Sequence, residues 1–166
     1  MFKAIVIGGT GATGSQLIKK LIDHDKCEHV TSIGRRPVMN GDKNDKLSDV
    51  VIDSLFDLAS TSEYWKKNDF FFNCIGTTRK RAGGAKQFVD IELGISKEAA
   101  KMAYKSGVPY AALISAEGAD HKKWATQWIH PLLYIKTMGQ KEQTVVFDYS
   151  FDYVAVFKPG MLIRLQ

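Results

Sequence analysis

Short apolar runs alternate along this chain with longer stretches in which apolar residues recur every three or four positions. The short runs are rich in β-branched and aromatic residues, which is typical of buried strands. They predict strands at residues 3–7, 30–33, 50–52, 70–74, 110–114 and 153–157. The longer stretches carry helical periodicity and predict helices at residues 11–25, 87–105 and 132–147.

This alternation predicts the fold class. Strands separated by helices indicate an α/β protein with a parallel sheet covered by helices on both faces. Right-handed crossovers then favour a doubly wound Rossmann sheet with strand order 3-2-1-4-5-6. Two segments do not fit: residues 36–46 are polar and read as a loop, and residues 116–130 suggest a surface excursion or a lid. The length of 166 residues predicts one domain, residues 1–166.

Composition and charge narrow the class of protein. The chain is 45% hydrophobic and 25% charged, and its net charge of +5 favours anionic partners. No apolar run reaches the roughly 20 residues that span a bilayer, and the amino-terminal run lacks signal-peptide features. Two cysteines without metal spacing suggest a reducing compartment, so we expect a cytoplasmic location, with a nuclear one possible. The four histidines show no ligand spacing and no nucleic-acid motif occurs, so we expect no metal and no nucleic acid.

A glycine pattern follows the first predicted strand and opens the first predicted helix. In "VIGGTGATGSQL", Gly8 permits the tight turn, Gly11 lets backbone N–H groups approach a pyrophosphate, and Gly14 permits close helix–sheet packing. The helix start supplies free N–H groups, and two threonines can add hydroxyl donors. The pattern predicts dinucleotide binding, with an ordinary strand–helix turn as the alternative. The candidate residues are Gly8, Thr10, Gly11, Ala12, Thr13 and Gly14.

The end of the second strand predicts which dinucleotide binds. An acidic residue there would bind the ribose 2′-hydroxyl of NAD, but this chain has Arg35 and Arg36, which suit the 2′-phosphate of NADP. A solvated basic turn is the alternative. Asp53, just past the third strand, is a candidate for the adenine amino group, or a simple turn aspartate.

Several motifs together resemble one family. "GGTGATG", "SIGRR", "CIGTTRKRAG", "ISAEGAD", "LLYIK" and "VFKPGMLI" are similar to the oxidoreductase family of the HIV Tat-interacting protein, an atypical branch of the short-chain dehydrogenases. The resemblance implies a Rossmann fold that binds NADP(H). It implies that Cys74, Ile75, Gly76 and Thr77 line the cofactor, and that Pro159, Gly160, Met161 and Leu162 pass near the nicotinamide.

The catalytic pattern departs from the short-chain dehydrogenases. Their Tyr-x-x-x-Lys motif uses tyrosine as the acid/base and lysine to hold the ribose and lower the tyrosine pKa. Tyr134 matches the tyrosine, but Met138 occupies the lysine position. Lys136 points to the opposite side of the helix, and Lys141 lies roughly 10 Å further along the axis. Ser115 matches a serine that orients the carbonyl; packing on a helix face is the alternative for Tyr134 and Met138.

Two functions remain open at this stage. One is an NADPH-dependent oxidoreductase acting on an unknown carbonyl-type small molecule. The other is a catalytically weak or inactive regulator or scaffold that uses NADPH occupancy to bias a protein partner. The family continues past the "FKPG" strand into a substrate-side lobe, which we expect to be missing or truncated here. The basic run 79–81 could contact phosphates or an acidic substrate, although a solvated loop is the simpler interpretation.

Overall fold

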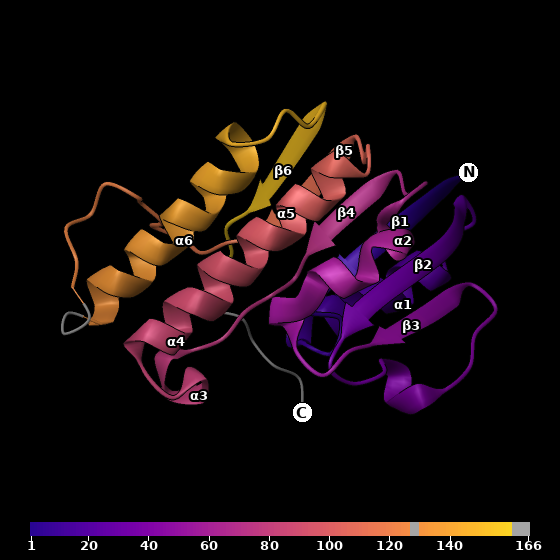
Figure 1. Ribbon diagram of the computed structural model, residues 1–166, viewed down its shortest axis with the longest axis horizontal. Coiled ribbons are helices and arrows are strands. Elements are labelled where there is room, and N and C mark those ends of the chain that lie inside the picture. Colours follow the sequence, from indigo (N-terminus) through magenta and orange to yellow (C-terminus); the bar gives the residue numbers. More distant parts are fainter. Residues whose placement is uncertain (127–129, 161–166) are drawn as a thin grey trace.

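The computed structural model describes residues 1–126 and 130–160 and contains one parallel sheet. The strand order is β3-β2-β1-β4-β5-β6, which confirms the predicted doubly wound Rossmann topology (Figure 1). All adjacent strands are paired in parallel. The strands are β1 (Phe2–Ile7), β2 (Cys27–Gly34), β3 (Leu47–Val51), β4 (Phe70–Asn73), β5 (Tyr110–Ile114) and β6 (Tyr153–Phe157).

Helices connect the strands. They are α1 (Ala12–Ile22), α2 (Ser62–Trp65), α3 (Arg79–Ala82), α4 (Ala85–Val89), α5 (Ser96–Lys105) and α6 (His130–Phe147), with 3₁₀ turns at Met39–Gly41 and Leu55–Thr61. A π-helical turn, Asp90–Ile95, joins α4 to α5, so the helix predicted at residues 87–105 exists but contains a wider turn. Such π turns often occur at functional sites, because they redirect side chains without ending a helix.

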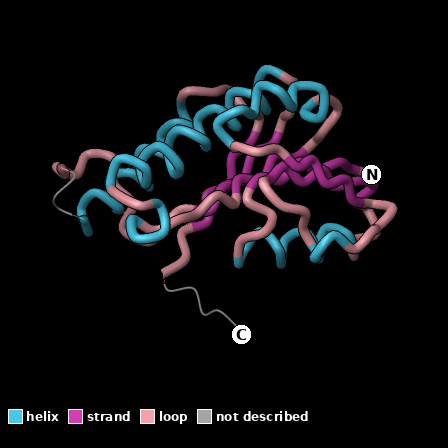
Figure 2. The backbone as a smooth tube through the Cα atoms, turned by 60° about the horizontal axis from the view of Figure 1, so that its bottom comes forward, coloured by secondary structure: helices cyan, strands magenta, loops and turns pink. Residues whose placement is uncertain are grey.

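Helices pack against both faces of the sheet (Figure 2). On one face, the apolar side of α5 packs against residues such as Ile5, Phe71 and Leu113. On the opposite face, α1 contributes Ile18 and Leu21 to a second cluster with β1 and β2. Because β1 is covered on both faces, its last four residues are buried and apolar, as expected for a central parallel strand.

The segment before α6 is attached to that helix. The backbone N–H of Asp120 donates to the carbonyl of Ile135 over 3.1 Å. Gly139 faces this contact, and a Cβ there would lie 2.2 Å from the backbone nitrogen of His121. Glycine therefore permits the close approach, and it is residues 120–121 of the segment 116–130, for which the sequence suggested a surface excursion or a lid, that contact α6. No helix in the described ranges is long and apolar enough to cross a membrane.

Candidate cofactor-binding site

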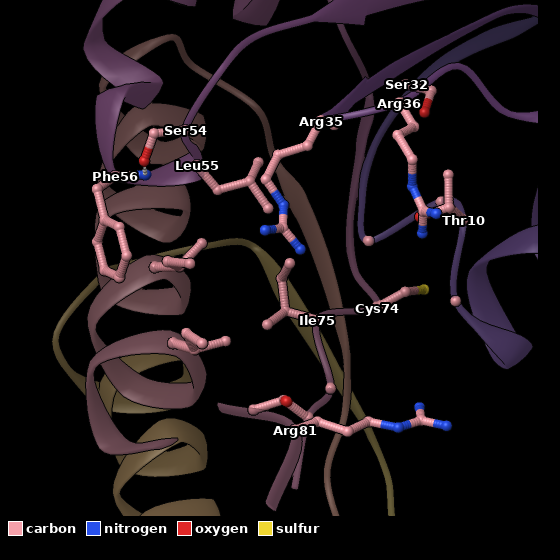
Figure 3. A pocket seen from close by; sticks show the side chains of 18 of the residues that line it. Thr10, Ser32, Arg35, Arg36, Ser54, Leu55, Phe56, Cys74, Ile75 and Arg81 are labelled. Carbon is pink, nitrogen blue, oxygen red and sulfur yellow. Dashed lines mark hydrogen bonds between the residues drawn. The ribbon is translucent and has the colours of Figure 1, made fainter. Parts of the chain in front are cut away.

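A cleft of about 530 Å³ opens at the carboxyl ends of β1, β2 and β4 (Figure 3). This is where ligands bind in doubly wound sheets, and the volume lies within the range of small-molecule sites. Of the residues predicted to bind the cofactor, the ones lining it are Gly8, Thr10, Gly11, Arg35, Arg36, Asp53, Cys74, Ile75, Gly76 and Thr77. Other residues that line the cleft were not predicted from the sequence, among them Gly9, Ser32, Ser54, Leu55, Phe56 and Ile91.

The three motif glycines have different roles in the structure. Gly8 has a φ of +78°, and a Cβ there would lie 2.5 Å from the carbonyl carbon and oxygen of Cys74. Gly14 is buried, and its Cβ would lie 2.3 Å from the carbonyl oxygen of Gly8. Gly11 has ordinary extended backbone, and its Cβ would lie 3.2 Å from that same oxygen. Gly8 and Gly14 are thus needed for packing, whereas Gly11 leaves open the space that a phosphate would occupy.

Three guanidinium groups reach the cleft. Arg35 and Arg36 follow β2 directly and project from the turn, Arg35 beside Ile75 and Arg36 beside Thr10 (Figure 3). Arg81 reaches the cleft from α3 on the other side. In the sequence, the basic run 79–81 was a candidate contact for phosphates or an acidic substrate, with a solvated loop as the simpler interpretation. Their combined positive charge makes the cleft suited to an anionic ligand.

The loop after β4 forms one wall of the cleft. Cys74 lies at its base, where burial raises the pKa of the thiol to about 11, although the positive charge of Lys141 opposes this rise. Behind the wall, the ammonium of Lys141 donates to the carbonyl oxygen of Ile75 over 2.8 Å and pairs with Glu92 over 3.2 Å. From the sequence, Lys141 was excluded as a substitute for the missing lysine because it lies roughly 10 Å further along the helix axis. Helical spacing could not show which neighbour its long side chain reaches.

Tyr134 does not line this cleft, and its surroundings differ from those expected of a short-chain dehydrogenase tyrosine. Its ring packs on Phe88 with centroids 5.8 Å apart. Burial, together with the negative charge of Glu92, raises the pKa of the Tyr134 hydroxyl. Met138 is only 3% exposed. These contacts are consistent with the packing alternative, and the catalytic role of Tyr134 stays a prediction.

Ser115 is buried and likewise lies outside the cleft lining. Its hydroxyl donates to the carboxylate of Glu142 on α6. Glu142 also pairs with Lys158 at the end of β6, with a distance of 2.8 Å. Ser115 therefore takes part in a link between β5, α6 and β6, and its hydroxyl proton is already engaged.

The remaining predicted site residues lie elsewhere. Ala12 and Gly14 are in α1 outside the cleft lining, and Thr13 borders a second, apolar hollow of about 230 Å³ with Leu17 and Phe72. The carbonyl of Pro159 accepts from the backbone N–H of Glu117 over 3.1 Å. A Cβ at Gly160 would lie 2.8 Å from the carboxylate of Glu117, and neither residue lines the cleft. The predicted residues Met161 and Leu162 lie outside the described part of the chain. Within the described residues no group of three or more acidic, histidine or cysteine side chains is arranged to hold a metal ion.

Comparisons with known proteins give the family context. Residues 4–122 match the model of the NAD dependent epimerase/dehydratase family. Protein FMP52 of Debaryomyces hansenii is 34% identical over 164 residues, covering 96% of this chain and 66% of its own. Protein HTATIP2 of Rattus norvegicus is 30% identical over 161 residues, covering 95% of this chain and 62% of its own. The chain thus spans somewhat less than two thirds of the length of these relatives.

Solved structures share the fold at low sequence identity. The oxidoreductase ylbE of Lactococcus lactis superposes with a TM-score of 0.74 at 18% identity, covering 99% of this chain and 71% of that one. MoeE5, solved with UDP-glucose and NAD, gives a TM-score of 0.69 at 15% identity, covering 94% of this chain and 53% of that one.

The comparisons correct one prediction. The FMP52 relatives from Debaryomyces hansenii, Meyerozyma guilliermondii and Candida albicans are all named as mitochondrial proteins. The expected cytoplasmic location is contradicted by these names. The inference was wrong because a reducing environment, read from two unpaired cysteines, does not distinguish the cytosol from other reducing compartments.

Proposed function

Because this chain belongs to the NAD dependent epimerase/dehydratase family, we propose that it binds NADP(H) in the cleft and serves as an atypical short-chain oxidoreductase. The match to HTATIP2 confirms the resemblance seen in the sequence to the Tat-interacting protein family. A nicotinamide dinucleotide is thus the expected cofactor, and the preference for NADP(H) is our proposal. The proposed substrate class is a carbonyl-type small molecule.

The observation that carries the NADP(H) preference is the arginine pair beside the glycine loop. Arg35 and Arg36 line the cleft where strand β2 ends, and no acidic side chain takes the ribose position of NAD enzymes directly after this strand. Each charge-assisted hydrogen bond from a guanidinium to a phosphate is worth about 1.5–3 kcal/mol before solvent screening. Since the site is open to water, a preference of about tenfold or more for NADPH is expected.

The residues of the cleft fit the parts of a dinucleotide. The missing Cβ of Gly11 leaves room for a pyrophosphate beside the free N–H groups at the start of α1. Asp53 lines the same cleft, which supports the proposal that its carboxylate accepts a hydrogen bond from the adenine amino group. The cofactor, when bound, supplies hydride chemistry; the chain itself binds, orients and excludes water.

The residues expected to transfer protons in an oxidoreductase are poorly suited to that task here. The raised pKa of Tyr134 makes its hydroxyl a weaker acid and keeps it protonated near neutral pH, so it donates a proton poorly and is not available as a base. Tyr134 and Ser115 are engaged in contacts away from the cleft, and Met138 provides no charge. These observations favour the second candidate, an NADP(H)-binding regulator or scaffold with slow or no turnover.

Calorimetric titration of the purified protein with NADPH and NADH tests the proposal. We expect NADPH to bind at least about tenfold more tightly, and the double variant Arg35→Ala plus Arg36→Ala to lose this preference. A matched control, Lys122→Ala plus Lys123→Ala, removes two exposed charges outside the cleft and should keep the preference. Equal affinities for the two cofactors in the wild type contradict the assignment.

Two further measurements decide between the candidates. Consumption of NADPH with a panel of aldehydes, ketones and quinones, absent in Tyr134→Phe, would support the oxidoreductase; tight NADPH binding without turnover would support the regulator. We also propose a mitochondrial location, on the names of the FMP52 relatives. Cell fractionation tests it, and recovery of the protein solely outside mitochondria would refute it.

A further inference from the structure

A fully buried ion pair lies directly behind the wall of the cleft. The side chains of Lys141 on α6 and Glu92 in the π-helical turn are 0% and 1% exposed, and the two residues are 49 positions apart in sequence. Lysine and glutamate are seldom fully buried, because removing each charge from water costs several kcal/mol. A surface pair such as Lys101–Glu98 has no such cost.

Each partner also holds the backbone of the loop after β4. The ammonium of Lys141 donates to the carbonyl oxygen of Ile75 over 2.8 Å. The second carboxylate oxygen of Glu92 accepts from the backbone N–H of Thr77. The pair thus fixes the two residues on either side of Gly76, from two helical elements that approach the loop from behind.

Gly76 is the residue of this wall whose backbone faces the cleft without obstruction. The backbone N–H of Ile75 is also occupied, since it donates to the side-chain oxygen of Asn73 over 3.1 Å. Gly76 itself is exposed, lines the cleft, and has no heavy atom within 4 Å of the position that a Cβ would take. The loop therefore presents one unobstructed backbone segment to the ligand while its neighbours are held on both sides.

The same helix lacks a charge one turn earlier. Met138 takes the position where short-chain dehydrogenases have a cofactor-binding lysine, and it is buried. Lys141 lies three residues later, and its ammonium faces the end of β4 from behind the wall. Since Lys141 is inaccessible, it cannot touch the cofactor and acts on the site only through the loop.

We propose that Lys141 and Glu92 are positioning residues that fix Ile75–Thr77 as a rigid wall, so that the dinucleotide binds against a preformed surface. This inference rests on the proposed NADP(H)-binding function and explains why a costly buried pair is present. Preorganisation of this kind raises affinity, because less ordering is required when the ligand binds.

The test compares neutral variants of similar shape in the full chain. Lys141→Met removes the ammonium and leaves a buried, unpaired carboxylate, so we expect a lower free energy of unfolding and NADPH affinity reduced at least tenfold. Lys141→Met plus Glu92→Gln removes both charges and should regain stability, while NADPH affinity stays at least fivefold below the wild type because the carbonyl of Ile75 lacks its donor. Lys101→Met breaks a surface pair and should change neither quantity.

Stability from urea unfolding and affinity from calorimetry are measured on each protein. A merely structural role predicts that affinity returns together with stability in the double variant, and this result would overturn the inference. Glu92→Gln leaves the buried ammonium of Lys141 without its carboxylate partner, so we expect NADPH affinity at least fivefold below the wild type in this variant as well. Should both variants of Lys141 fail to fold, wild-type affinity in folded Glu92→Gln overturns the inference. Wild-type protein that does not bind NADPH refutes the proposed function instead, and the inference with it.

Discussion

Replacing Gly8 by alanine should mainly lower the stability of the protein, whereas replacing Gly11 by alanine should mainly weaken NADPH binding, although both glycines lie in the same loop. At Gly8 the backbone φ is +78°, so a side chain adds about 1–2 kcal/mol of left-handed strain. Its Cβ would also lie 2.5 Å from the backbone of Cys74, and relieving such overpacking costs about 1–3 kcal/mol. Together these give a loss of about 2–5 kcal/mol, a large part of the total stability of a domain.

At Gly11 the same change is nearly free of strain. Its φ is −78°, and the nearest atom to a Cβ is the carbonyl oxygen of Gly8, at 3.2 Å. Gly11 is also the N-cap of α1, where alanine is somewhat worse than glycine, so the expected cost is about 1 kcal/mol. The methyl group, however, would take space in the cleft where the pyrophosphate is expected, and affinity for NADPH should fall at least about tenfold.

Urea unfolding followed by the fluorescence of the buried Trp65 gives the stabilities, and calorimetry gives the affinities. The expected pattern is an unstable Gly8→Ala and a folded Gly11→Ala with weak NADPH binding. Folded Gly11→Ala with wild-type affinity would show that the phosphates do not lie on this loop. Gly8→Ala as stable as the wild type would refute the strain argument.

Two further predictions concern Cys74 and Met138. Because burial raises the pKa of Cys74 from 9.0 to about 11, the folded state keeps a proton that the unfolded state releases, so stability is complete below pH 9 and falls between pH 9 and 11. The free energy of unfolding should fall by about 2–3 kcal/mol over this range. Urea unfolding at a series of pH values measures it, and stability should depend less on pH in Cys74→Ala than in the wild type. The same pH dependence in both proteins contradicts the raised pKa. Met138→Lys would place an unpaired ammonium at a site only 3% exposed, so we expect several kcal/mol of destabilisation against less than about 1.5 for Met138→Leu. A Met138→Lys protein with wild-type stability in urea would show that the new ammonium finds water or a partner.

The sequence by itself determined the features that depend on neighbours along the chain. Alternation of apolar runs and amphipathic stretches was enough for six strands in the order β3-β2-β1-β4-β5-β6, since parallel connections have few permitted topologies. Gly8, Arg35 and Arg36 were found because they follow strands that end at the cleft, and Gly11 because it opens the helix that comes next. At such positions the backbone direction alone decides where a residue points.

Only the tertiary structure decided which distant residues meet. Helical spacing placed Lys141 on α6, but it could not show that the ammonium reaches Ile75 and Glu92, which lie 66 and 49 positions away. It could not show either that Tyr134 packs on Phe88 outside the cleft. The periodicity of a helix identifies which side chains share a face; which element covers that face, and how far a long side chain extends across it, depend on the packing of the whole chain.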